Sequence, residues 1–378
     1  MKSISFRNGI LTLALLALPL AVRAAAPHFT GPPASFAGIY SNNRGALTVT
    51  LSANGKFTGK GSEYPGKTIS LHGTLGASGT FSGVFGNPAV PYGITLTGTS
   101  LGTYILTGST GGREIVAYPN LYSKTNPTVA AKYTTLITGT DPSLAVPQGT
   151  GYATINISKT GAGSVSGKLA DGTSFTASGV LVNGTSGPEL VVFDQNIYGH
   201  KGLIAGSLNV SRLLSAVVFQ NQVAVQTGLV PSPDAAYGNL LWDKQAKKGS
   251  YYAAGFSTTV YDNGYLYSKG LGVPFTTGTA TIGGGGLSSA VEQPFTVTSA
   301  GVVTISGTNP NNVKLSFKTS TGAISGSFEP VPGKKPKVNF RGLLVQYPDD
   351  AIGGGYFLGP VVSGTGLSGY IELPTLVK

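Results

Sequence analysis

The chain contains no cysteine among its 378 residues. This excludes disulfides, thiolate metal sites, cysteine nucleophiles and the attachment of lipid to an N-terminal cysteine. Charged residues are also scarce, at 10% of the chain, although the formal net charge is +11. Such a chain must be held together by backbone hydrogen bonds and core packing, and its length permits two or three domains.

Histidine is nearly absent as well, with only His28, His72 and His200. No His-x-His or His-Glu-x-x-His spacing occurs, so we expect no zinc site. His72 alternates with apolar neighbours and should face outward from a strand, whereas His200 lies in a glycine-flanked turn. Only the fold could bring these two histidines together.

The few carboxylates are expected at turns, where an aspartate bonds its own backbone; these are Asp171, Asp262, Asp349 and Asp350. The last two fit neither an EF-hand nor a calcium β-roll. The glycine tract 283–286 lacks the Gly-Lys-Ser/Thr ending of a phosphate loop, and no Gly-x-Ser-x-Gly elbow precedes a helix. We therefore expect a protein that is not an enzyme, with no catalytic residue, no metal and no cofactor.

Helix-forming periodicity is missing after the first residues, because no run keeps apolar residues at helical spacing for three turns. Glycine is plentiful, at 57 residues, and short alternating segments of apolar and polar residues recur. Three pairs, Asn54-Gly55, Asp171-Gly172 and Asn263-Gly264, are typical of type I′ hairpin turns. The composition thus indicates many short strands joined by tight turns.

One pattern, G-x-[FVI]-[ST]-G-[KS], occurs three times, at residues 55–60, 163–168 and 322–327. Each copy is preceded by an alternating run, and each is followed by a strand-like segment with another glycine. The repeat predicts an all-β fold of repeated antiparallel β-meander or hairpin units, which form curved sheets or barrel-like modules.

The glycines of the repeat have two expected roles. The first glycine of each copy should occupy a hairpin position with positive φ; these are Gly55, Gly163 and Gly322. The later glycines should lie inside strands, where glycine permits a bulge, a bend or close contact with a neighbouring ring; these are Gly59, Gly167, Gly326, Gly73, Gly179 and Gly342. Both roles are geometric rather than catalytic.

The beginning of the chain has the pattern of a secretory signal: Lys2 and Arg7 precede an apolar run over 10–22, and Val22-Arg23-Ala24 fits the cleavage rule. The apolar run is too short for a spanning helix, and no second stretch of spanning length follows. The expected organisation is a signal peptide over 1–24, an N-terminal tail over 25–32, and three β-repeat units over 33–130, 131–248 and 249–378. The third unit would carry an aromatic-rich insertion.

Three stretches resemble a module of secreted bacterial glycine- and threonine-rich β-repeat proteins, which often occurs in large adhesin-like chains. They are residues 151–179, the pair Leu240-Leu241-Trp242 and 251–256, and residues 311–359. The resemblance covers most of the chain after the signal and contains no known catalytic motif. It therefore implies an architecture and an exported location, but no reaction.

Aromatic residues gather between positions 242 and 267. On β-strands, such rings can stack on sugars or form a protein-contact patch. The candidate glycan-stacking residues are Trp242, Tyr251, Tyr252, Tyr261, Tyr265 and Tyr267. The alternative is that half of these rings form core and the others make cross-strand pairs.

The basic residues are scattered, apart from Lys334, Lys335 and Lys337 with Arg341. This cluster lacks the neighbouring exposed aromatics of a stacking platform, so we expect a solvated hairpin loop and no nucleic-acid partner. The preferred interpretation is a secreted structural or adhesion-type protein that binds cell-surface polysaccharide or protein. It would be periplasmic, on the cell surface or extracellular. The alternative is an outer-membrane β-barrel.

Overall fold

The structure is a computed structural model that describes residues 29, 31–85, 90–98, 104–110, 112–210, 234–347, 351–361 and 366–373. The expected signal peptide, most of the N-terminal tail, His28, Asp349 and Asp350 lie outside these residues. Within the described part of the chain, no helix combines the length and apolarity needed to cross a membrane.

The protein consists of three eight-stranded antiparallel units, so the all-β prediction is confirmed. The first is a curved sheet in the order β4-β3-β2-β1-β8-β7-β6-β5, in which β1 pairs with β8 and the edge strands are β4 and β5. Its strands are β1 (Ala34–Tyr40), β2 (Gly45–Leu51), β3 (Lys56–Glu63), β4 (Lys67–Thr74), β5 (Thr80–Phe85), β6 (Val90–Gly98), β7 (Tyr104–Thr110) and β8 (Arg113–Pro119).

The second unit is a closed barrel, in which β16 pairs with β9. Closure removes the free edges of the sheet. Its strands are β9 (Ala131–Gly139), β10 (Gly151–Ile157), β11 (Ala162–Lys168), β12 (Ser174–Gly184), β13 (Gly187–Asp194), β14 (Gly202–Val210), β15 (Ala235–Lys244) and β16 (Phe256–Leu266), with a short helix α1 (Ile197–His200) after β13.

The third unit is again a curved sheet, in the order β19-β18-β17-β24-β23-β22-β21-β20. The 3₁₀ turn η2 (Lys269–Leu271) precedes it. Its strands are β17 (Thr277–Gly284), β18 (Val291–Val297), β19 (Val303–Ile305), β20 (Lys314–Lys318), β21 (Ala323–Phe328), β22 (Val338–Gln346), β23 (Ala351–Leu358) and β24 (Ser368–Leu373).

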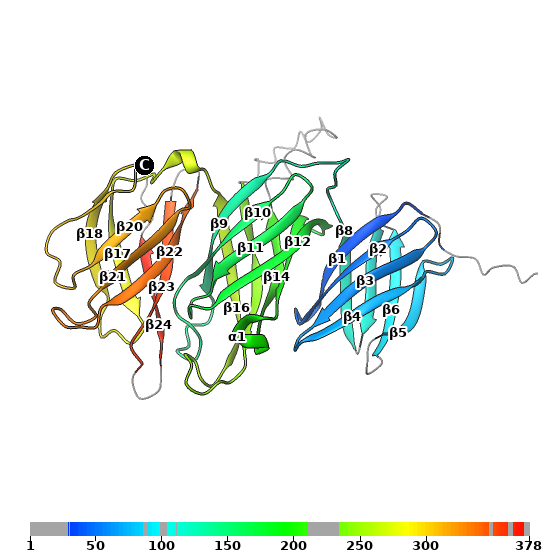
Figure 1. The fold of residues 1–378 in the computed structure, drawn as a ribbon, viewed down its shortest axis with the longest axis horizontal. Helices are drawn as coiled ribbons and strands as arrows, with labels where there is room; N and C mark the ends of the chain where they lie inside the picture. The colour runs from blue at the N-terminus through cyan, green and yellow to red at the C-terminus, as the bar shows by residue number, and fades with distance from the viewer. Residues whose placement is uncertain are drawn as a thin grey trace, which may run out of the picture.

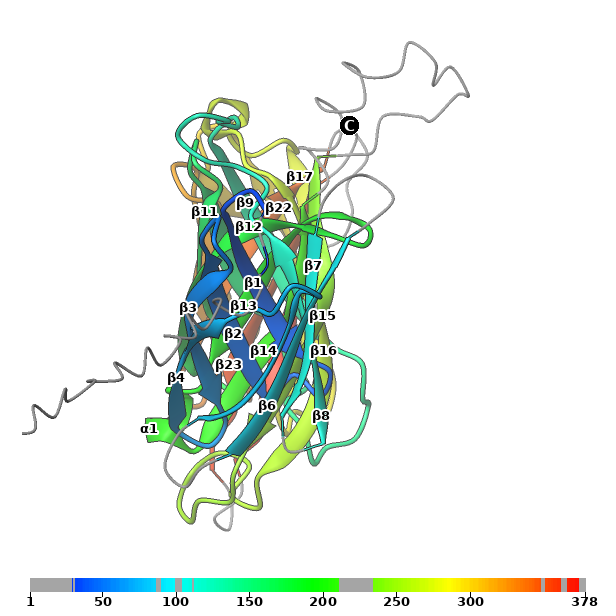
Figure 2. The ribbon, with the colours of Figure 1, turned by 90° about the vertical axis from the view of Figure 1, so that its right-hand side faces the viewer.

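The three barrel-like units stand side by side in a row with their strands similarly inclined (Figure 1). We call them the first, second and third barrels, although strand pairing between described residues closes only the second. Viewed along the row, they overlap almost completely (Figure 2). Each unit has its own apolar core, formed because alternate strand residues point inward. The end of the second barrel that carries α1 is at the bottom of Figure 1, and we call this the lower end.

Some of the repeat glycines allow rings to lie flat against the sheet. Gly167 faces Phe175 across the β11–β12 ladder, and a β-carbon on Gly167 would be 2.7 Å from that ring. Gly326 faces Phe340 in the same way in the third unit. All six later glycines lie inside strands, as expected. A neighbouring ring accounts for Gly167, Gly326 and Gly73, whereas Gly59, Gly179 and Gly342 face backbone or aliphatic atoms.

The turn predictions had mixed outcomes. Gly55 and Gly172 have φ of 78° and 86° and lie in the expected hairpins. In the second copy, however, the turn residue is Gly161, at φ 77°, and Gly163 lies within β11. The expected turn at Asn263-Gly264 was wrong: Gly264 lies within β16 and pairs with Thr135 of β9. A β-carbon on Gly264 would clash with the Thr134 carbonyl oxygen.

The unit boundaries follow from the barrels. The second barrel extends to the end of β16 at Leu266, beyond the expected boundary at 248, because β15 and β16 are needed to close it. The aromatic-rich segment is therefore the last hairpin of the second barrel and not an insertion in the third unit. The third copy of the repeat occurs late because β17, β18 and β19 precede it.

Candidate functional site: the junctions between the barrels

The six candidate aromatic residues do not form one exposed platform. Trp242 is buried inside the second barrel, where its ring meets Phe256 edge-on at 4.8 Å and its Nε1 donates to the Tyr198 hydroxyl at 3.0 Å. Tyr252 and Tyr267 are also buried, and Tyr251 and Tyr265 are half-buried. Of the six, only Tyr261 is exposed, with 38% of its surface accessible.

Four of these tyrosines instead join the second barrel to the third. Tyr251 donates its hydroxyl to the Gly359 carbonyl at 2.7 Å, and the Tyr252 hydroxyl lies 2.9 Å from that of Ser368. Tyr267 donates to the Thr319 carbonyl, and the rings of Tyr265 and Tyr347 are 5.6 Å apart. The sequence pattern identified the right segment but could not show that the hydrogen-bond partners of its tyrosines lie 52 to 116 residues further along the chain.

The sheet faces between these hydroxyl contacts also touch. β9 and β10 of the second barrel pack against β22 and β23 of the third. The rings of Tyr152 and Tyr356 stack at 6.3 Å, and the Thr150 amide donates to the Gly355 carbonyl at 3.1 Å. This junction is therefore a broad contact rather than a flexible link.

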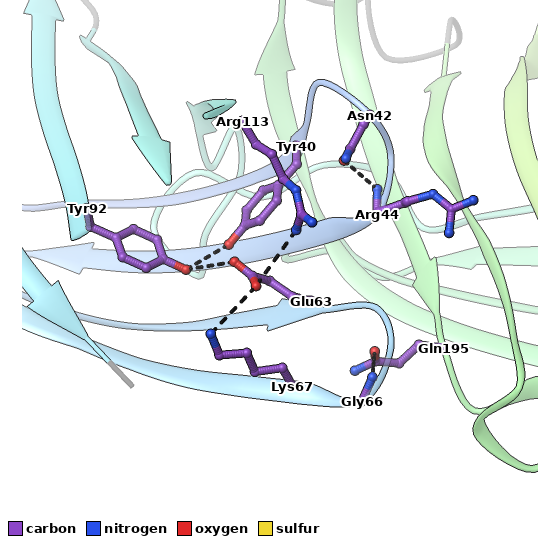
Figure 3. A network of polar contacts seen from close by, with 9 residues as sticks. All are labelled: Tyr40, Asn42, Arg44, Glu63, Gly66, Lys67, Tyr92, Arg113 and Gln195. Atoms are coloured by element: carbon purple, nitrogen blue, oxygen red, sulfur yellow. Dashed lines mark hydrogen bonds and ion pairs between the residues drawn. The ribbon is translucent and has the colours of Figure 1, made fainter. Parts of the chain in front are cut away.

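The first barrel is joined to the second by polar contacts at the lower end. Arg44 pairs with Asp243 at 2.8 Å, and Gln245 donates to the Tyr64 hydroxyl at 3.0 Å. Gly66 donates its amide to Gln195 at 3.0 Å, as Figure 3 shows. Beside these contacts, Tyr64 is buried against Leu203 and Ala205 of the second barrel.

The loop between β15 and β16 thus reaches both neighbours, and Lys244 at its start is buried beneath it. The ammonium group donates to the Tyr251 and Tyr252 carbonyls, at 2.8 Å each, and to the Ser250 hydroxyl at 3.0 Å. Burial lowers the pKa of Lys244, while Asp171 opposes this shift. The three acceptors fix the course of the loop that carries both tyrosines to the third barrel.

Lys244 is one member of a network that fills the lower end of the second barrel. The Tyr198 hydroxyl donates to Asp171 at 2.6 Å. The Lys244 ammonium lies over the Tyr198 ring, 5.4 Å from the ring centre. Burial raises the pKa of Asp171 and that of Tyr198. Tyr198, His200 and Tyr252 all have positive φ, which costs free energy for residues with a β-carbon. The surrounding packing must hold these three positions.

We expect that Lys244→Met will weaken this loop by about 3 kcal/mol, because two buried carbonyls and one hydroxyl lose a charged donor. Amide hydrogen exchange should become faster over 245–255. The matched control is Lys247→Met, since Lys247 is exposed on the same loop. Equal exchange rates in both variants would show that Lys244 does not anchor the loop.

A second polar network closes the lower end of the first barrel (Figure 3). Tyr92 donates to Glu63 at 3.1 Å, and the hydroxyls of Tyr40 and Tyr92 are 3.1 Å apart. Lys67 and Arg113 flank the Glu63 carboxylate at 4.0 and 3.8 Å. Burial is the main cause of the raised pKa of each tyrosine. These side chains therefore supply one another with hydrogen-bond and ion-pair partners at this end of the first barrel.

The remaining sequence candidates lie apart from these networks. His72 is exposed on β4 of the first barrel, and His200 is exposed on α1 of the second. Lys337 pairs with Glu329 at 3.6 Å within an exposed loop of the third unit. Glycines 284–286 form an ordered turn with positive φ that ends β17. Over the described ranges, no three His, Cys, Asp or Glu side chains are grouped closely enough to hold a metal ion.

Asp262 was expected at a turn, and this prediction was wrong. It lies in the middle of β16 with 1% of its surface exposed. No hydrogen bond of ordinary geometry reaches either carboxylate oxygen. Its position in the strand became visible only with the register of β16 against β9.

Two clefts lie at the junction of the first two barrels. One has a volume of about 250 Å³ and is lined by residues that include Glu189. The other has a volume of about 460 Å³ and is lined by residues that include Lys60 and Phe193. Val191 lines both clefts. Neither cleft could be read from the sequence, because each wall comes from a different barrel.

Comparisons of the chain with protein-family models and with curated proteins found no match. The resemblance to secreted bacterial β-repeat proteins therefore rests on the sequence motifs alone.

Proposed function

We propose that this protein is an exported, non-catalytic structural or adhesion-type protein that presents a row of β-barrels and binds glycan or another surface partner. The observation that carries the proposal is that the loop between β15 and β16, with the end of β15, contacts both the first and the third barrel. Asp243 and Gln245 hold the first barrel, while Tyr251 and Tyr252 hold the third. A row fixed in this way can span a distance and expose long side walls.

The composition of the barrel walls supports the same proposal. The interiors are filled with apolar side chains. The exposed outward positions of β2, β3 and β4 are polar, as shown by Thr48, Thr50, Thr58 and His72, although Val84 on β5 and Val116 on β8 are exposed apolar residues. A wall of this kind suits contact with water and with polar polymers better than contact with lipid tails, which require an apolar outer band.

The test is to express the chain with its signal, locate it by fractionation, and measure its binding to purified cell-surface polysaccharide. We expect a soluble, β-rich protein that is retained by at least one polysaccharide. Recovery only from the outer membrane in detergent would favour the alternative of an outer-membrane barrel. Turnover of a glycan or peptide by the purified protein would contradict the non-catalytic assignment.

A further inference from the structure

The larger cleft between the first two barrels combines polar and apolar walls. Its volume of about 460 Å³ lies within the range of small-ligand sites, which often form between domains. We call it the Lys60 cleft. Its lining includes Thr48, Lys60 and Ser62 from the first barrel and Ser178, Val191 and Phe193 from the second.

Lys60 is the charged residue of this lining. Its side chain is exposed on the outer face of β3, and none of the ion pairs between described residues involves it. The smaller cleft has Glu189 as its charged residue instead. An anionic group is therefore favoured in the Lys60 cleft and disfavoured in its neighbour.

The other walls are suited to a sugar ring. Phe193 is half-buried at the junction, where it offers a fixed aromatic surface. Thr48, Ser62 and Ser178 offer hydroxyl groups, which both donate and accept hydrogen bonds. Sugars present the same combination of an apolar ring face and a rim of hydroxyls.

We propose that the Lys60 cleft binds an acidic saccharide, with its carboxylate on Lys60, its hydroxyls on the serine and threonine side chains, and its ring on Phe193. This inference rests on the proposed function and names its ligand class and site. A carboxylate carries one negative charge, which a single lysine matches. A phosphate carries up to about two charges and is usually held by an arginine fork or several charged donors, whereas Lys60 is the one charged donor in this lining.

The experiment titrates the mature protein with disaccharides that contain uronic or sialic acid, each alongside its neutral counterpart, by calorimetry. We expect saturable binding of an acidic disaccharide and about tenfold weaker binding of its neutral counterpart, as expected for one charge-assisted hydrogen bond. Lys60→Gln should weaken acidic binding by a similar factor. Lys56→Gln is the matched control, because Lys56 is exposed on the same strand but outside the cleft.

A second variant, Ser178→Phe, fills the cleft from an exposed wall position and should abolish binding without disturbing either core. The inference is overturned if no acidic disaccharide binds at millimolar concentration, or if Lys60→Gln and Ser178→Phe both bind like the unaltered protein. In the latter case the glycan-binding function stands and only the site is wrong. Recovery from the outer membrane alone would count against the proposed function instead.

Discussion

Replacing Asp262 with asparagine should improve the stability of the second barrel by about 3 kcal/mol more at pH 8 than at pH 5. Asp262 shares the inward face of β16 with Val260, a member of the barrel core. Burial raises the pKa of Asp262 from 3.8 to about 7, whereas the nearby Thr135 hydroxyl lowers it by less. Among the described residues, no charged group contributes to the shift in this pKa.

The direction of the effect follows from where the proton is held more tightly. Below about pH 4 the carboxyl is protonated in both the folded and the unfolded chain, so its ionisation takes nothing from the free energy of unfolding. As the pH rises towards 7, the unfolded chain has lost the proton while the folded barrel retains it, so the free energy of unfolding falls. Above pH 7 the loss is constant. The interval from pH 5 to pH 7 covers two pKa units, which correspond to about 3 kcal/mol.

The measurement is urea unfolding followed by tryptophan fluorescence. Trp242 is the only tryptophan in the chain and is 2% exposed inside this barrel, so its emission reports on this unit. The unpaired asparagine amide costs the same at both pH values and cancels from the comparison. Asp141→Asn is the matched control, because Asp141 is exposed in the same barrel. If both variants show the same pH dependence as the unaltered protein, Asp262 is not the titrating group.

Gly167→Ala should destabilise the second barrel by roughly 3 kcal/mol, at the upper end of the cost of overpacking a core. The added methyl group would meet the Tyr152 carbonyl oxygen, the Phe175 ring and the Ala153 β-carbon together. Two of these are backbone or core atoms that cannot move without disturbing the β10–β11 and β11–β12 ladders. The same fluorescence measurement would give the change in unfolding midpoint.

Gly139→Ala is the control for this substitution. Gly139 lies at the end of β9 in the same barrel, has no positive φ, and has only the Pro147 carbonyl within ordinary contact distance. Alanine should therefore be tolerated there or slightly stabilising, because it reduces the freedom of the unfolded chain. Equal losses in the two variants would refute the role assigned to the ring contact at Gly167.

Local sequence signals were sufficient for the class of fold and for several turns. Asn54-Gly55 and Asp171-Gly172 specify their hairpins because these turns require positive φ, which glycine adopts easily. This requirement involves only about four consecutive residues. Asn263-Gly264 carries the same signal but lies in a strand, since barrel closure requires β16 to continue along β9. The dipeptide cannot report a pairing between strands that are more than a hundred residues apart.

The candidate site shows the same limit more strongly. The density of aromatic residues over 242–267 indicated a contact segment, but not which rings face the core and which face a neighbour. Trp242 is interior because it lies on the inward face of β15, and Tyr252 is buried because the third barrel covers it. Neither fact is encoded in the spacing of the rings.

The sequence by itself therefore determined the all-β class, several hairpin turns and the placement of the repeat glycines inside strands, because alternation and turn geometry act over a few residues. Tertiary structure decided the extent of the second barrel, the burial of Asp262, the locking loop after β15 and the clefts between barrels. Each of these depends on surfaces that come together only when sheets close and pack, and their partners are distant in the chain.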